Sequence, residues 1–310
     1  MTNLFLFAIF SYSVRITNVI KEGIIMINKI IRSRDYMNFD AIGKECELFY
    51  LFHSSGFSSL KPEQRLTLLQ ELENIEAKKQ NRKPYKVVSD NKDERLMNAG
   101  IIFGKNGKPG KILFNEKYIF EGKEETYNPI TREKTYEEVE GLNIRLLDSM
   151  LHEQFHALFH HLICGLNQGE GELYRELKEY KTYFDCHEVT ERQQQADIRK
   201  EFYLYITNPD EYYAFEYAYE NTLNIFRYLN GRYGFDDSIG SYKDYQICTR
   251  RMAEQSFLHD TGVVSNYEEI YKILLNNWAL KYAQQNGYTV NSVMHDISNS
   301  KKLLDHYHVF

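Results

Sequence analysis

The segment from residue 143 to residue 163 constrains the fold of this chain more than any other, because its apolar side chains recur at helical spacing. Asn143 is placed to cap the start of this predicted helix, and Gly165 is placed to end it. The positions that define the apolar pattern are Ile144, Leu147, Met150, Leu151, Phe155, Leu158, Phe159 and Leu162.

Four of the ten histidines fall within this predicted helix, in the stretch MLHEQFHALFHH at 150–161. His152 and His156 are four residues apart, so a helix brings both imidazoles to one face, where they can reach the same ion. A catalytic zinc ion takes three protein ligands and keeps its fourth position for water. Glu153, about 100° round the helix, would flank such an ion and act as the general base.

An HExxH pattern can also arise by chance in a chain with many histidines, and the stretch would then be a polar part of an ordinary helix. Burial argues against this alternative, because two imidazoles and a carboxylate are costly to bury on an apolar helix without partners. We therefore expect His152 and His156 to bind a metal. His160 and His161 are expected to be polar residues near the helix end, where histidine interacts favourably with the helix dipole. The alternative for His160, which shares the face of His156, is that it lines the cleft or contacts a ligand from behind.

HEQFH at 152–156 resembles the motif of the zincin metallopeptidases, which carry HExxH on their active-site helix. The longer metzincin motif does not fit, because Phe159 and Leu162 stand where that motif requires glycine and histidine. The resemblance is therefore to the gluzincins, whose third zinc ligand is a glutamate on a later helix, often within ExxA. That resemblance implies Glu211, in the stretch NPDEYYAFEYAYEN, as the third ligand.

Helical geometry favours Glu211 over the glutamates near it. Ala214 and Ala218 follow it at i+3 and i+7, and small side chains on that face would let the two helices approach closely. Glu216 and Glu220 fall on other faces and are expected to meet solvent or to make contacts behind the ligands. One alternative is that Glu211 only complements the helix dipole. Another is that Glu170 or Glu172 supplies the third ligand.

Two further points follow from the resemblance. Zincins place a strand antiparallel to bound substrate before the active-site helix, and GKILFNEKYIF at 110–120 occupies that position in the sequence. The order of motifs over residues 60–225 is also loosely similar to that of zincin-like domains in bacterial polymorphic toxins and effectors. That similarity implies a peptidase-like effector and names no target.

The rest of the chain is predicted to be mostly helical with a few strands before the histidines. KPEQRLTLLQELENIEAKKQ at 61–80 has the pattern of an amphipathic helix. A short strand is predicted at 85–88, and a hairpin joins strands near 100–103 and 111–120 through the turn-rich GKNGKPG. ETYNPITREKTYEEVEG at 125–141 is predicted to be a polar loop, as are NGRYGFDD and SIGS. Further helices are predicted at 172–184, 189–205, 209–229 and 265–285.

A few strands followed by a mostly helical remainder predict an α+β fold, with a small antiparallel sheet before the active-site helix. The chain is long enough for one large domain. We expect a peripheral helical segment at 1–59, a zincin-like catalytic domain at 60–235 and a helical extension at 236–310. Residues 1–36 are expected to be peripheral to function, and Met26 and Met37 are alternative starts.

Composition narrows the partners of the chain. The net charge of −6 comes from interspersed residues without a long basic run, so nucleic acid is not an expected partner. LFLFAIF at 4–10 is too short to cross a bilayer, so no integral membrane span is expected. The four separated cysteines are expected to be reduced thiols. Compartment and oligomeric state are left open.

Together these features predict a zinc-dependent metallopeptidase with His152, His156 and Glu211 as ligands of Zn²⁺, Glu153 as general base, and a peptide or protein as substrate. No tyrosine among the 25 can be chosen as the group that stabilises the oxyanion, and Tyr212, Tyr213 and Tyr217 are expected to be packing residues. The alternative is a non-catalytic helical interaction protein in which the metal site is structural or absent.

Overall fold

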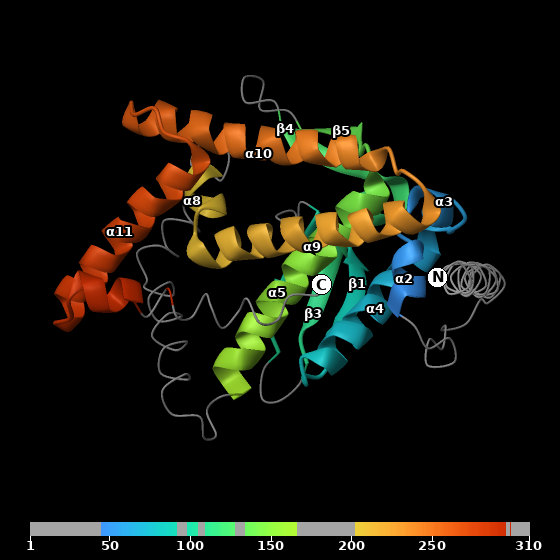
Figure 1. The fold of residues 1–310 in the computed structure, drawn as a ribbon, viewed down its shortest axis with the longest axis horizontal. Coiled ribbons are helices and arrows are strands. Elements are labelled where there is room, and N and C mark those ends of the chain that lie inside the picture. Colours follow the sequence, from blue (N-terminus) through green and yellow to red (C-terminus); the bar gives the residue numbers. More distant parts are fainter. Residues whose placement is uncertain are drawn as a thin grey trace, which may run out of the picture.

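The computed structural model describes residues 45–91, 98–104, 109–127, 134–165, 202–295 and 298 (Figure 1). Several predictions lie outside this part of the chain. They concern residues 1–36, the helix at 172–184, most of the helix at 189–205, and the alternative ligands Glu170 and Glu172.

The described chain is mostly helical with a small sheet, which confirms the α+β prediction at this level. Four of the predicted helices are present. The helix predicted at 61–80 is α4 (Pro62–Lys79), and the one carrying the histidines is α5 (Leu142–Gly165). The helices predicted at 209–229 and 265–285 are α9 (Pro209–Tyr233) and α11 (Tyr267–Asn286). The remaining helices are α2 (Glu45–Tyr50), α3 (Ser54–Phe57), α8 (Phe202–Ile206) and α10 (Ser238–Thr261).

Helix α10 corrects one prediction, because SIGS at 238–241 was expected to be a loop and instead forms its first turn. Its buried residues are Tyr242, Gln246, Ala253 and Phe257. Only two of these four are large and apolar, so the helical stripe is weak in the sequence although the face is buried in the structure.

The main sheet has three strands in the order β1–β3–β2. Strand β3 (Lys111–Asn115) pairs antiparallel with β2 (Ala99–Ile102), as the predicted hairpin requires. Its other side pairs parallel with β1 (Lys86–Asp90), so the sheet is mixed and not antiparallel as predicted. The prediction that 110–120 forms one strand beside the substrate was also wrong. Strand β3 is central, and the chain turns into the π-helix η2 (Lys117–Glu121) after it.

A second, two-stranded antiparallel sheet replaces the polar loop predicted at 125–141. Strand β4 (Lys123–Tyr127) pairs with β5 (Lys134–Glu138), with Lys123 opposite Glu138. The residues of β5 from 135 to 138 are all exposed. The sequences of the two strands, KEETY and KTYEE, lack the alternation of apolar and polar residues that marks a half-buried strand.

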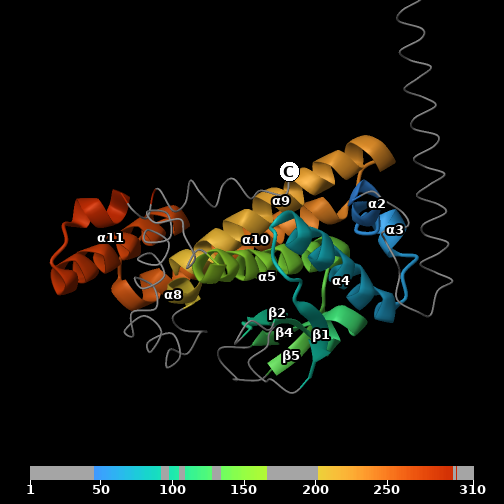
Figure 2. The ribbon, with the colours of Figure 1, turned by 90° about the horizontal axis from the view of Figure 1, so that it is seen from below.

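Helix α5 lies at the centre of the molecule. Figure 2 shows it between the strands on one side and helices α9 and α10 on the other. It packs most extensively against α9, and it also contacts β2, α4 and α10. One buried apolar cluster extends from Leu48 to Val293 through this helix, whose residues Leu147, Met150 and Leu151 are fully buried. The predicted domain boundaries near residues 60 and 236 stay predictions.

A smaller apolar cluster joins α8, α10 and the start of α11. It contains Tyr203 and Ile206 from α8, and it fixes this short helix beside the start of α9. None of the described helices is both long and apolar enough to cross a membrane. Cys248, the cysteine whose side chain the structure describes, is exposed and makes no disulfide.

Candidate metal centre

Helix α5 presents His152 and His156 on one face, one turn apart, and both side chains are buried. The start of this helix differs from the prediction that Asn143 caps it. The helix begins at Leu142, and the amide of Asn143 instead donates a hydrogen bond of 2.8 Å to the carbonyl oxygen of Phe52. That bond ties the first turn of α5 to the segment after α2.

Helix α9 brings Glu211 to the same place from its first turn. Ala214 and Ala218 are almost completely buried on this helix, as expected for small residues at a close contact between two helices. The carboxylate oxygen Oε2 of Glu211 lies 3.2 Å from Nε2 of His152 and 3.6 Å from Nε2 of His156. The structure therefore brings together three residues separated by up to 59 positions (211 − 152) in the sequence.

The geometry of these three atoms fits one small cation. The two Nε2 atoms are 3.1 Å apart, so the three ligand atoms form a triangle with sides of 3.1, 3.2 and 3.6 Å. Ligands about 2.0 to 2.1 Å from a tetrahedral zinc ion are separated by about 3.3 to 3.4 Å. Two imidazoles and one carboxylate are also a ligand set of catalytic zinc sites. The residues present therefore fit zinc, and zinc binding itself stays a prediction.

The Oε2 atom of Glu211 is a buried oxygen without a hydrogen-bond partner among the described residues. The two imidazoles approach it closely, but neither donates a hydrogen bond to it. A buried carboxylate oxygen in this position is costly unless something compensates its charge. Burial acts to raise the pKa of Glu211, but His156 and His152 outweigh it and place the pKa well below the ordinary value. The carboxylate is therefore charged at neutral pH.

Glu153 is buried on α5, next to His152, with 6% of its surface exposed. Its carboxylate does not belong to the group of three side chains whose ligand atoms could hold one ion. This agrees with a position beside the ion and not in its coordination shell. The charges of Glu153 and Glu211 both act on the phenol of Tyr205.

Tyr205, on α8, is a residue that the sequence did not single out. Its phenol interacts with Glu211 through charge and hydrogen bonding, and with Glu153 through charge. The ring of Phe215 contacts both this tyrosine and a metal ligand, with its centroid 6.3 Å from that of Tyr205 and 4.6 Å from that of His152. Burial and the two carboxylates raise the pKa of Tyr205 well above 10.0, so the hydroxyl keeps its proton. In sequence, its only signal is that it lies six residues before Glu211.

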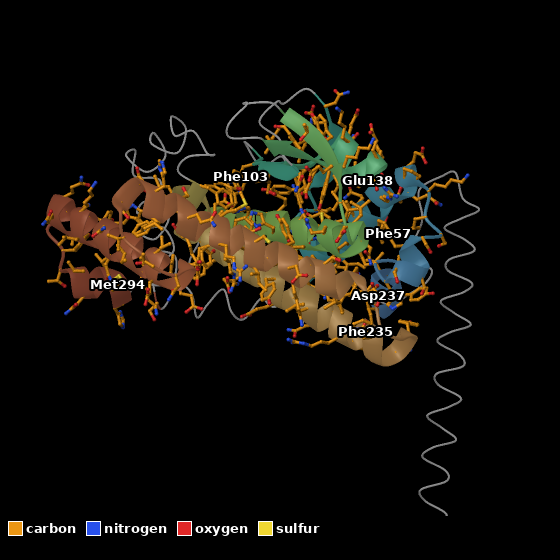
Figure 3. The ribbon with its side chains drawn as sticks, turned by 90° about the horizontal axis from the view of Figure 1, so that it is seen from above. Phe57, Phe103, Glu138, Phe235, Asp237 and Met294 are labelled. Atoms are coloured by element: carbon orange, nitrogen blue, oxygen red, sulfur yellow. The ribbon has the colours of Figure 1, made fainter. Side chains whose placement is uncertain are left out.

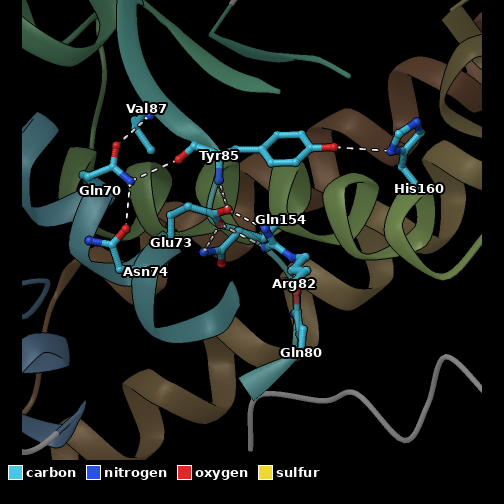
Figure 4. A network of polar contacts seen from close by, with 9 residues as sticks. All are labelled: Gln70, Glu73, Asn74, Gln80, Arg82, Tyr85, Val87, Gln154 and His160. Atoms are coloured by element: carbon cyan, nitrogen blue, oxygen red, sulfur yellow. Dashed lines mark hydrogen bonds and ion pairs between the residues drawn. The ribbon is translucent and has the colours of Figure 1, made fainter. Parts of the chain in front are cut away.

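A buried polar network holds the opposite side of the HEQFH segment (Figure 4). The amide of Gln154 donates to Glu73 of α4 over 3.1 Å, and Arg82 binds the same carboxylate through two nitrogens at 2.5 and 3.0 Å. The backbone nitrogen of Tyr85 also donates to Glu73, over 2.8 Å. Helix α4, the segment before β1 and helix α5 therefore meet at one carboxylate.

His160 makes specific contacts that the prediction of a polar helix end did not include. The hydroxyl of Tyr85 is 3.3 Å from Nδ1 of His160, and the ring of Phe103 stacks on His160 with centroids 4.5 Å apart. Phe103 follows β2 and lies at the end of the sheet nearest the C-terminal helices, whereas Phe57 and Phe235 lie at the opposite end of the molecule (Figure 3). These contacts attach the later part of α5 to the main sheet.

Glu216 and Glu220 of α9 have partners or solvent elsewhere, and Tyr212 and Tyr217 pack against apolar or aromatic residues, as predicted. Glu216 forms an ion pair of 2.8 Å with Arg250 of α10, and Glu220 is exposed. The ring of Tyr212 stacks on Tyr271 of α11 at 3.8 Å, and Tyr217 is buried in the main apolar cluster.

The described residues thus contain one convergence of two imidazoles, a carboxylate and a flanking glutamate, built from α5 and α9 with α8 beside them. Comparison of the whole chain with protein-family models, curated proteins and solved structures finds no match.

Proposed function

We propose that this protein is a zinc-dependent metallopeptidase of the gluzincin-like type, in which His152, His156 and Glu211 hold the zinc ion. The observation that carries the proposal is the triangle of ligand atoms, completed by a buried Glu211 oxygen without a hydrogen bond. A buried glutamate next to the ligands distinguishes this site from a purely structural one, which has no need of a base.

The roles of the side chains follow from their positions. When bound, zinc supplies Lewis-acid activation of water and of the substrate carbonyl. Glu153 takes a proton from the attacking water and passes it to the nitrogen of the departing amine. Tyr205 keeps its proton, and its phenol interacts with the carboxylate of Glu211, so it would help to hold this ligand in place.

A peptide is the substrate that best suits the neighbouring sheet. Strand β2 pairs with β3 on one side, and no other described strand pairs with its second side. It also packs against α5, the helix that carries the two histidines. A free strand edge binds an extended peptide through main-chain hydrogen bonds. The substrate-aligning strand inferred from the resemblance is therefore assigned to β2 in place of 110–120.

The proposal is tested by incubating the zinc-loaded protein with a proteome-derived peptide pool and identifying new peptide ends by mass spectrometry. We expect cleavage by the wild type. Glu153→Gln should retain zinc and lose about 100-fold or more of the cleavage rate, because it removes the base. Glu220→Gln changes an exposed glutamate of α9 and should behave as the wild type.

Two results would contradict this function. Cleavage at the wild-type rate by Glu153→Gln would exclude that residue as the base. Zinc binding without any cleavage in a broad pool would favour the alternative, a non-catalytic helical protein with a structural metal site.

A further inference from the structure

The second nitrogen of His152 needs a partner if this histidine binds a metal. Its Nε2 atom points to the ligand triangle, where it lies 3.2 Å from Glu211 and 3.1 Å from His156. The other ring nitrogen, Nδ1, then carries the proton and faces away from the ion. Histidines that ligate metals nearly always donate this N–H to a carboxylate, a carbonyl or water, which fixes the orientation of the ring.

The candidate acceptor is the buried carboxylate of Asp148. It lies four residues before His152 on α5, so the two side chains share one face of the helix. Both are buried, each with 8% of its surface exposed. The charge of His152 also acts on the Asp148 carboxylate.

Helix α10 fixes the orientation of this carboxylate. The hydroxyl of Tyr242, which is completely buried, donates a hydrogen bond of 2.5 Å to Oδ1 of Asp148. The amide of Gln246, one turn further along α10, donates to the Tyr242 hydroxyl oxygen over 3.2 Å. Because that oxygen already accepts from Gln246, the proton of Tyr242 is committed to Asp148. Tyr242 uses Oδ1, and no hydrogen bond to Oδ2 is present among the described residues.

The environment of Asp148 shows that its charge needs compensation. Burial outweighs the hydrogen bond from Tyr242 and the charges of His152 and Arg145, so the pKa of Asp148 lies above its ordinary value. A buried carboxylate without a purpose is a cost that a hydrophobic residue would avoid. Orienting a metal ligand is a purpose that fits its place.

We infer that Asp148, held by Tyr242, is the positioning residue that orients His152 for metal binding. This inference rests on the proposed metal site and adds to it a connection with α10, a helix that supplies no ligand. Removing such a partner typically lowers metal affinity by about 10 to 100-fold.

The test measures zinc affinity of the full chain by competition with a chelating dye, and records the visible spectrum of the protein with Co²⁺. Asp148→Asn keeps the size of the side chain and an oxygen for Tyr242 but removes the charge. We expect it to bind zinc about 10 to 100-fold more weakly, with altered Co²⁺ absorption bands. Tyr242→Phe should weaken zinc binding in the same direction by a smaller factor.

Tyr203→Phe is the matched control. Like Tyr242, Tyr203 is a tyrosine whose hydroxyl donates a hydrogen bond to an aspartate, in this case to Asp260 over 2.6 Å. It should lower thermal stability without changing zinc affinity. If Asp148→Asn does not fold, Tyr242→Phe decides the question, since it lacks only one hydroxyl group.

The outcomes separate this inference from the proposed function. A wild type that binds zinc and an Asp148→Asn variant with the wild-type affinity and Co²⁺ spectrum would overturn the role of Asp148 alone. An equal loss of affinity in Tyr203→Phe would show that general destabilisation is the cause, and would also overturn it. A wild type that binds no zinc would overturn both.

Discussion

At the scale of single residues, Glu211 differs from the two other glutamates of α9. Glu216 has an arginine partner and Glu220 meets solvent, whereas the buried oxygen of Glu211 faces two imidazoles without accepting a hydrogen bond. Its pKa stays low because the charges of the two histidines outweigh the effect of burial. The side chain is therefore ionised at neutral pH and ready to bind a dication.

Replacing Glu211 by glutamine should remove most of the zinc affinity, because the amide lacks the charge that binds the ion. We expect zinc affinity to fall by more than the factor of about 10 to 100 that is typical when a residue that only orients a ligand is removed. Isothermal titration with zinc measures it. Glu216→Gln, on the same helix, should bind zinc as the wild type does, and similar losses in both variants would argue against Glu211 as a ligand.

The sequence predicted part of this site for a clear reason. His152, Glu153 and His156 are adjacent in the sequence, so helical spacing alone predicts their arrangement. Glu211 required a resemblance to a known family, and the structure places it beside the histidines. Tyr205 and Asp148 could not be found, because their roles depend on how α8 and α10 pack against α5, and residue type does not distinguish them from other tyrosines and aspartates.

At the scale of helices and strands, the distance between α5 and α9 determines whether the ligands meet. Ala218 is almost completely buried where the two helices pack. Ala218→Leu should destabilise the protein by about 1 to 3 kcal/mol through overpacking, and should weaken zinc binding by moving Glu211 away. Chemical denaturation and zinc titration measure the two effects. Glu220→Leu adds the same side chain at an exposed position of α9 and should change neither.

The ion pair between Glu73 and Arg82 connects α4 to the segment before β1 and is completely buried. Glu73→Ala leaves the guanidinium without its partner, so we expect a loss of about 3 to 5 kcal/mol in unfolding free energy. The comparison is Glu121→Ala, which removes an exposed pair with Lys123 and should cost about 0 to 1 kcal/mol. Equal losses in the two variants would show that the buried network does not hold these elements together.

The elements that the sequence predicted well are those with a regular apolar stripe, such as α4, α5 and α9. Helix α10 was missed because its buried face includes Gln246 and Ala253, and the second sheet because its strands are polar. The central position of β3 depends on its pairing with β1, about 25 residues earlier. Pairing over such distances is not encoded in a local pattern.

At the scale of the whole molecule, the single main core contains several tyrosines whose hydroxyl groups are buried. Burial raises the pKa of Tyr118 and of Tyr217 above the ordinary 10.0. The contribution of such a tyrosine to the unfolding free energy is fully present at pH values below the pKa of the unfolded state, which is about 10. The contribution is lost as the pH rises from there towards the folded pKa, since the unfolded chain then releases protons that the folded chain retains.

The unfolding free energy should therefore fall above pH 10, by about 1.4 kcal/mol at pH 11 for each tyrosine that stays protonated in the fold. Denaturant titrations between pH 7 and pH 11 measure the fall. Tyr118→Phe should show a shallower fall than the wild type, whereas Tyr288→Phe, at an exposed position, should leave it unchanged. A flat profile in the wild type would contradict the burial of these hydroxyl groups.

The proposed chemistry requires zinc at the junction of α5 and α9. The direct measurement is elemental analysis of the purified full chain, for the wild type and for His156→Ala, after exposure to zinc and removal of loosely bound ions. We predict one zinc ion per chain in the wild type and none in the variant, with the variant still folded by circular dichroism. A metal-free wild type, or the same zinc content in both proteins, would contradict the account.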